Sequence, residues 1–201
     1  MEKLIFATNN KNKVTEIRNV LGNLFDIITL EEAGILIDIP EPHDTLEANA
    51  TEKSSTIYKL TQKNCFSEDT GLEVKVLNGE PGVKSARYAG EDRAFDANIK
   101  KLLLNLEGIE NRKAHFRTVI SLILNEKEYQ FEGICEGEII KQQRGTNGFG
   151  YDPVFIPEGS TKTFAEMDMN EKNQFSHRKK AMNKLIEFLT AKEDNHGKSK
   201  D

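Results

Sequence analysis

Cysteine is scarce in this chain, and its placement does not suit cross-linking or metal binding. The 201 residues include two cysteines, Cys65 and Cys135, which form no CxxC motif and have no histidine at metal-ligand spacing. Disulfide frameworks and structural zinc sites need sets of such residues at defined spacings. The sequence therefore argues against both, and we expect two buried thiols on strands.

Basic residues are not in excess, and no long apolar run occurs. Lys and Arg number 28 against 33 Asp and Glu, a net charge of −5, so the chain lacks the positive charge with which proteins bind the nucleic-acid backbone. Apolar runs such as Val119–Leu124 are far shorter than the roughly 20 residues of a membrane span, and the first residues do not resemble a signal peptide. We expect a cytoplasmic protein without nucleic-acid or membrane partners, in which a local cluster of cations meets any bound phosphate.

The commonest nucleotide and hydrolase motifs are missing as well. Gly197-Lys198-Ser199 ends like a phosphate-binding loop, but Lys192 stands where the first glycine of that motif belongs. The glycines of 145–150 are in the wrong order for GxGxxG, and there is no GxSxG elbow. A chain like this can handle phosphates only through a less common arrangement.

Hydrophobic periodicity predicts a mixed fold, with a hairpin around the charged turn 125–128. The predicted strands are 3–7, 25–30, 65–76 with a kink at Gly71, 116–124, 129–135 and a third strand after the hairpin at 138–142; the predicted helices are 14–22, 45–60, 92–106 and 176–189. This order indicates an α/β (α+β mixed) fold with a partly antiparallel sheet. We expect one domain over residues 1–190 and a polar, disordered tail over 191–201.

The stretch Gly145–Phe155, GTNGFGYDPVF, is the least ordinary part of the sequence. Its glycines let backbone N–H groups approach a ligand, Phe149 and Tyr151 offer flat apolar faces, Asp152 adds an acceptor, and Pro153 stiffens the exit. The stretch predicts a site for a flat ring beside an anion. A glycine-rich turn between strands is the alternative.

The segment Thr8–Lys13 joins the first predicted strand to the first predicted helix. Free N–H groups and the helix dipole favour an anion at such a place, and Lys13 would add a positive charge. The alternative is an Asx turn followed by a solvated lysine.

Two adjacent carboxylates, Glu68 and Asp69, come shortly before Gly71. Adjacent strand residues face opposite ways, so only one of them can readily face a given site. A carboxylate there can bind Mg²⁺ or take a proton from water, and both suit attack on a polyphosphate. Glu41, between two prolines, is a candidate second oxygen ligand, with an exposed loop acid as the alternative.

A further polar group, Ser176-His177-Arg178, begins the last predicted helix, and Lys172 precedes it by four residues. It offers a helix cap, a ring and a guanidinium for a ligand. A basic surface patch would contain the same residues.

Five motifs, taken in order and spacing, closely resemble the inosine triphosphate pyrophosphatase family over nearly the whole chain. They are Thr8-Asn9-Asn10-x-x-Lys13, Glu68–Leu72, Pro81–Tyr88, Gly148–Pro153 and Ser176–Arg178. The resemblance implies a Mg²⁺-dependent homodimer that cleaves ITP, dITP and XTP to the monophosphate and pyrophosphate. It also implies a long, partly antiparallel central sheet flanked by helices, with two lobes around a substrate cleft.

The resemblance implies residue roles too. Asp69 would accept the proton of the attacking water and bind the metal, with Glu41 as a second metal-associated acid. The triphosphate would be held by Thr8, Asn9, Asn10, Lys11, Asn12, Lys13, Lys53 and Thr70, and the base and sugar by Phe149, Gly150, Tyr151, Asp152, Lys172, His177 and Arg178. A 6-oxo purine presents an acceptor where adenine presents a donor, so N–H groups near His177 would favour inosine.

The chain departs from the family pattern at one place. Many relatives read Glu-Asn-Ala where this chain has Ala48-Asn49-Ala50, and its acid is shifted to Glu47. The departure motivates one alternative function, a module that binds and senses a nucleotide without hydrolysing it. A second alternative is a related-fold pyrophosphatase that acts on modified pyrimidine triphosphates.

Overall fold

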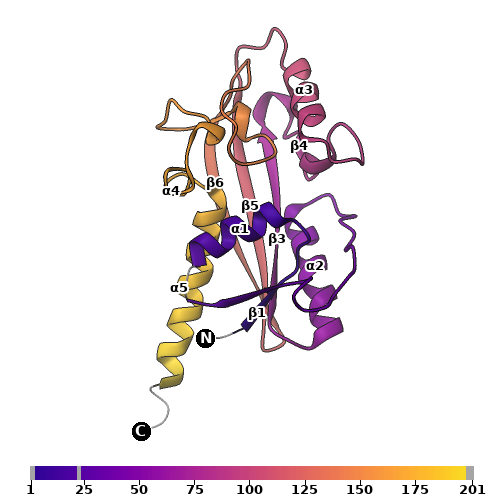
Figure 1. Cartoon of the computed structure of the whole chain (residues 1–201), viewed down its shortest axis with the longest axis vertical. Coiled ribbons are helices and arrows are strands. Elements are labelled where there is room, and N and C mark those ends of the chain that lie inside the picture. Colours follow the sequence, from indigo (N-terminus) through magenta and orange to yellow (C-terminus); the bar gives the residue numbers. More distant parts are fainter. Residues whose placement is uncertain (1–2, 22–23, 198–201) are drawn as a thin grey trace.

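One mixed sheet runs the length of the molecule (Figure 1). The structure is a computed structural model that describes residues 3–21 and 24–197, with side chains through residue 191. In this part of the chain the sheet has 7 strands in the order β2-β1-β3-β5-β6-β7, with β4 pairing β3. The strands are β1 (Lys3–Phe6), β2 (Asp26–Thr29), β3 (Cys65–Val74), β4 (Pro81–Gly82), β5 (Lys113–Leu124), β6 (Lys127–Ile139) and β7 (Phe155–Pro157). β1 is parallel to both β2 and β3, and the other pairs are antiparallel.

Helices cover both faces of this sheet. They are α1 (Lys11–Leu21), α2 (Leu46–Thr61), α3 (Phe95–Asn105), α4 (Met169–Lys172) and α5 (His177–Gly197), with 3₁₀ turns η1 (Lys75–Leu77), η2 (Ser85–Arg87), η3 (Asp152–Val154) and η4 (Phe164–Glu166). In Figure 1, α5 and α2 lie on opposite sides of the long strands, and α3 and β4 lie at the end away from β1. The strand period of two therefore sends alternate side chains of β3 and β5 to different helices.

Two apolar clusters occupy the face of the sheet that α1 and α5 cover. One joins Phe66 of β3 and Ile120 of β5 to α1 and α5, and the other joins Leu72 and Phe116 to α3, η3 and η4. Between them the same face carries Glu68, Thr70 and Thr118, all three at strand positions that alternate in step with the apolar ones. The sheet thus has an apolar, polar, apolar pattern along its length, and the polar part marks where a site can lie.

The mixed fold expected from the sequence is confirmed, and so is the hairpin. Its strands β5 and β6 are joined at Asn125 and Glu126, which both have positive φ (50° and 68°), as a tight hairpin turn requires. Both cysteines are free and buried, as expected. The third strand expected at 138–142 is wrong, because Glu138 and Ile139 end β6 and instead pair with β7. A short apolar run after a hairpin does not show from sequence whether it turns back or continues the strand.

Several element boundaries differ from expectation for local reasons. β3 runs through Gly71 as a paired strand, and glycine is needed there because a Cβ would lie 2.7 Å from the carbonyl oxygen of Gly82. α5 continues past Leu189 to Gly197, so the start of the expected tail is helical; the helix end expected at Gly22 and residues 198–201 lie outside the described residues. None of the helices in the described ranges is long and apolar enough to cross a membrane.

Candidate functional site

The pocket that the motif residues line lies at a gap in the edge of β3. β1 pairs with β3 as far as Phe66, and β4 pairs with it again from Leu72, so the residues between have no strand neighbour on that side. The chain leaves β1 at this point into the loop 7–10, and a pocket of about 1200 Å³, its open mouth included, lies beside the gap. Side chains from both faces of β3 can reach it there, as at the switch points where open sheets bind ligands.

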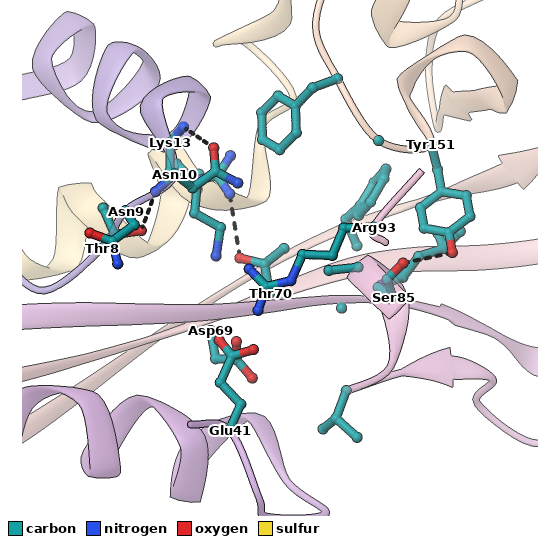
Figure 2. A pocket seen from close by; sticks show the side chains of 18 of the residues that line it. Thr8, Asn9, Asn10, Lys13, Glu41, Asp69, Thr70, Ser85, Arg93 and Tyr151 are labelled. Carbon is teal, nitrogen blue, oxygen red and sulfur yellow. Dashed lines mark hydrogen bonds between the residues drawn. The ribbon is translucent and has the colours of Figure 1, made fainter. Parts of the chain in front are cut away.

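Asp69 and Glu41 lie close together on the α2 side of this gap (Figure 2), and Lys53 pairs with both of them. Lys53 of α2 donates to Asp69 Oδ1 at 2.9 Å and to Glu41 Oε1 at 2.6 Å. Arg87 Nη1 lies 3.3 Å from the other Glu41 oxygen. Asp69 and Lys53 are each 6% exposed. Glu41 is therefore not an exposed loop acid but one partner in a buried ion group.

The surroundings give the two carboxylates different proton affinities. Burial raises the pKa of Asp69, and the nearby Lys53 and Lys13 only partly offset it. For Glu41, burial acts in the same direction, but Lys53, Lys13 and Arg87 outweigh it and lower the pKa to about 2. Neighbouring carboxylates whose pKa values are shifted in opposite directions are typical of active sites in which one of the two exchanges a proton. Asp69 is the better proton acceptor of the pair.

The same two carboxylates suit a hard divalent cation. Mg²⁺ is usually bound by one or two carboxylates together with water and substrate phosphates. Asp69 and Glu41 each bind the Lys53 ammonium through one oxygen, and the Asp69 carboxylate lines the pocket. Among the described residues no group of three or more His, Cys, Asp or Glu could hold a metal by itself. The donor set thus fits a cation that completes its coordination with substrate and water.

Glu68 faces the opposite side of β3, as the strand period predicted. Its carboxylate accepts from Arg178 Nε at 2.7 Å and Nη2 at 2.9 Å, and Lys13 Nζ lies 3.1 Å away. Burial would raise the pKa of Glu68, but Arg178 and Lys13 outweigh it and hold the pKa well below the ordinary value. Glu68 is therefore a charged support beneath the pocket and does not line it.

The loop before α1 is fixed by its own side chains. Asn10 Oδ1 accepts from the N–H groups of Asn12 (3.0 Å) and Lys13 (3.2 Å), and Thr8 Oγ1 accepts from Asn10 N at 3.2 Å. The Asx turn is thus present, but Lys13 is not solvated, because its side chain is 15% exposed and paired with Glu68. Thr8, Asn9, Asn10 and Lys13 line the pocket. Lys11 and Asn12 are exposed and outside the lining.

A buried ion network lies at the other side of the pocket. Glu16 of α1 accepts from Lys172 at 2.7 Å and from Arg178, and Lys172 also donates to Asp152 at 2.6 Å. Lys172, His177 and Arg178 are all at most 4% exposed, so they are not a basic surface patch. Sequence reasoning missed Glu16; its signal was an acid directly beside Ile17, on the apolar side of the first helix.

The glycine and aromatic stretch forms one wall. The Asp152 carboxylate accepts from Phe149 N at 2.9 Å, and a Cβ at Gly148 would lie 2.0 Å from that carboxylate. Tyr151 donates to the Ser85 carbonyl at 2.8 Å and is buried. The half-buried Phe149 ring lies 5.5 Å from Lys172 Nζ and 6.2 Å from the Phe95 ring. The stretch is a tightly constrained loop that presents Phe149, Gly150 and Asp152 to the pocket.

His177 is the one buried side chain in the described residues with an unpaired polar atom, Nδ1. Its ring stacks on Phe116 with centroids 4.7 Å apart, and it lines the pocket. Burial, with Arg178 and Lys172 close by, holds the pKa of His177 well below its ordinary value. A neutral imidazole has one donor and one acceptor, so His177 can meet a polar group of a ligand.

The sequence does not predict a role for several lining residues. Ser85 and Ala86 belong to the motif Pro81–Tyr88, and Arg93, Phe95 and Asn98 follow it. Glu47, the shifted acid, pairs with Arg117 and does not line the pocket. It therefore does not replace a carboxylate missing at Ala48.

The comparisons with known proteins agree in coverage. The sequence model of the Ham1 family matches residues 4–188. A dITP/XTP pyrophosphatase of Flavobacterium johnsoniae is 52% identical over 94% of this chain and 98% of its own length, and one of Porphyromonas gingivalis is 53% identical over the same shares. Among solved structures, the Staphylococcus aureus Ham1 protein is 38% identical with a TM-score of 0.86, covering 95% of this chain and 100% of its own. A HAM1 protein from Coxiella burnetii is 37% identical with a TM-score of 0.87 over the same shares.

Proposed function

The chain belongs to the Ham1 family, and from this membership we propose that it hydrolyses the triphosphates of non-standard purines to the monophosphate and pyrophosphate. It is a hydrolase that acts on nucleoside triphosphates, as its relatives' names indicate. A sensing module and a pyrimidine-specific enzyme are not favoured, since those relatives are named as dITP/XTP pyrophosphatases.

One observation carries the assignment of the site: the five separated motifs converge on a single pocket. Its lining includes Thr8–Asn10 and Lys13, Asp69–Leu72, Ser85–Ala86, Phe149–Asp152 and His177–Arg178. Residues that are distant in sequence thus supply cations, a proton acceptor and aromatic faces to one volume. That combination is what a nucleoside triphosphate requires.

The reaction needs a water to attack the α-phosphorus and a group to take its proton. We propose Asp69 as that acceptor, because burial raises the pKa of its carboxyl and Lys53 fixes its position at 2.9 Å. The O–P bond to water forms, the bond to the pyrophosphate oxygen breaks, and the proton passes to Asp69. Mg²⁺ held by Asp69 and Glu41 would offset the charge that develops on the phosphates.

Lys13 and the Thr8–Asn10 loop would hold the phosphate chain. Lys13 enters the pocket from the first turn of α1, where the helix dipole also favours an anion. Lys53 and Thr70 line the same part of the site. Lys11 would contribute through its backbone N–H in the first turn of α1, whereas the Asn12 N–H is bonded to Asn10 Oδ1 and holds the turn together.

The base and sugar would lie between Phe149 and the start of α5. Phe149 offers a ring for stacking on the purine, while Asp152 and Lys172 would fix the nucleoside, with Tyr151 supporting the wall. Arg178 is largely committed to Glu16, Glu68 and Thr70. The unpaired His177 and the first N–H groups of α5 are therefore the better donors to a 6-oxo group.

We further propose that Mg²⁺ is the metal, that the protein is a cytoplasmic homodimer, and that residues 1–190 form one domain of two lobes. A substrate panel tests the function directly. With Mg²⁺, ITP, dITP and XTP should each give the monophosphate and pyrophosphate by mass, much faster than ATP or GTP. Release of orthophosphate alone, or equal turnover of ATP, would refute the proposal.

A further inference from the structure

The cations that line the pocket are, with one exception, already paired with carboxylates of the protein. Lys13 lies 3.1 Å from Glu68, and Lys53 lies 2.9 Å from Asp69. The remaining pairs are Lys53 with Glu41, Lys172 with Glu16 and Asp152, and Arg178 with Glu16 and Glu68. Their charges are therefore largely balanced before any substrate enters.

Arg93 is the exception. It lines the pocket and is exposed, and within the described ranges the structure records no ion pair or hydrogen bond for its side chain. It lies on the segment between η2 and α3, with a left-handed backbone (φ 53°). Figure 2 shows its side chain extending into the pocket toward the region of Thr70 and Asp69. Its guanidinium is thus free to meet a ligand.

The charge balance of the pocket favours a phosphate contact by the unpaired Arg93 guanidinium. The pocket is lined by four carboxylates, Asp38, Glu41, Asp69 and Asp152, and two more, Glu16 and Glu68, lie behind it and pair with lining cations. Together these carboxylates outnumber the lining cations that are paired with them. A triphosphate brings about four more negative charges, and one Mg²⁺ would offset two of them, so an uncommitted cation would strengthen its binding. An exposed guanidinium can serve as this cation, because it is more weakly hydrated than an ammonium and can donate two parallel hydrogen bonds to a phosphate.

We propose that Arg93 binds the phosphate chain of the substrate from the α3 end of the pocket, opposite Lys13. The proposal rests on the function proposed above. A bound triphosphate is then contacted from two sides, by Arg93 near α3 and by the loop before α1. It acts on affinity for the phosphates and not on the choice of base, which lies with the residues around Phe149 and His177.

Binding of pyrophosphate tests the contact without requiring turnover. Calorimetry with pyrophosphate and Mg²⁺ would compare wild type with Arg93→Ala, Arg93→Lys and the control Lys100→Ala, which removes another exposed cation, on α3 and outside the pocket. We expect Arg93→Ala to weaken pyrophosphate binding about tenfold, as the loss of one charge-assisted contact does. Arg93→Lys should recover most of the affinity, Lys100→Ala should match wild type, and the ratio of ITP to GTP turnover should stay unchanged in all three.

The outcomes separate this inference from the proposed function. Equal pyrophosphate binding by Arg93→Ala and Lys100→Ala, or none by wild type, would overturn the role of Arg93. If the wild-type protein binds pyrophosphate but releases none from ITP, the proposed reaction is overturned. The Arg93 contact is then still tested by comparing pyrophosphate binding of wild type and Arg93→Ala. Arg93 is exposed, so melting curves of the variants should match wild type.

Discussion

Glu68 and Asp69 are neighbours on one strand, and isosteric amides at the two positions should have opposite effects. Asp69→Asn should abolish turnover and leave the fold as stable as before. Glu68→Gln should destabilise the fold. The contrast follows from the alternation of β3, which puts Asp69 beside Lys53 and Glu68 against Arg178 and Lys13.

The opposite effects of the two variants on stability follow from the directions in which the fold shifts the pKa values of Asp69 and Glu68. Burial raises the pKa of Asp69 in the fold above its unfolded value, so the ionised carboxylate costs stability at neutral pH. Asparagine removes that cost, and Lys53 keeps Glu41 as a charged partner at 2.6 Å. Burial acts likewise on Glu68, but Arg178 and Lys13 outweigh it and lower its pKa, so its charge contributes stability above its unfolded pKa that is lost as pH falls. Breaking a buried pair costs about 3–5 kcal/mol, against a total stability of about 5–15 kcal/mol. Loss of a general base lowers kcat by about 10²–10⁴-fold.

Urea unfolding at pH 7 and turnover of ITP measure the two effects separately. With an m-value of about 2 kcal/mol/M, Glu68→Gln should lower the urea midpoint by about 2 M, and Asp69→Asn should leave it equal or higher. Near wild-type turnover of Asp69→Asn would remove it as the base. A Glu68→Gln midpoint equal to that of wild type would show that the Glu68–Arg178 pair contributes nothing net.

Three other predictions test the phosphate loop, the base and the metal. Lys13→Ala should raise the KM for ITP about tenfold through the loss of one charged contact to phosphate, and an unchanged KM would make Lys13 a purely structural partner of Glu68. The apparent pKa of the acid limb of kcat/KM against pH should lie above the ordinary aspartate pKa of about 3.9. The reason is that burial raises the pKa of Asp69 and only its ionised form accepts a proton. An acid-limb pKa at or below the ordinary value would contradict the assignment. Removal of Mg²⁺ with EDTA should abolish pyrophosphate release while leaving the melting temperature unchanged, since Lys53 already holds both Glu41 and Asp69; a large fall in melting temperature would mean that the metal is structural.

Much of the fold could be predicted because its signals are local. The first strand, polar loop and helix follow from a short apolar run, an Asx turn at Asn10 and helical spacing, and each of these needs no distant partner. The hairpin of β5 and β6 is equally local. The pairing of β6 with β7 could not be predicted in this way, because it joins Gly137 to Pro157 across a long loop.

The candidate site also has features that the sequence indicates and features that depend on tertiary packing. Sequence pattern indicated which residues carry charge or a flat ring, and that Glu68 and Asp69 face apart. It did not indicate Glu16 or Arg93, because an acid on a helix and an arginine in a loop are ordinary until their partners are known. Nor could it distinguish a basic patch at Ser176–Arg178 from a buried network, since that depends on α5 packing against α1 and the sheet.

Residue identity and spacing were enough to establish the family, the mixed fold and the kinds of side chain available for phosphate and base. The distribution of charge among these side chains could be known only from the folded protein. The gap in β3 brings both faces of the strand to one pocket, burial and Lys53 separate the proton affinities of Asp69 and Glu41, and ion pairs commit every lining cation in the described residues except Arg93. Electrostatic interactions depend on distance and burial, which only the folded chain defines.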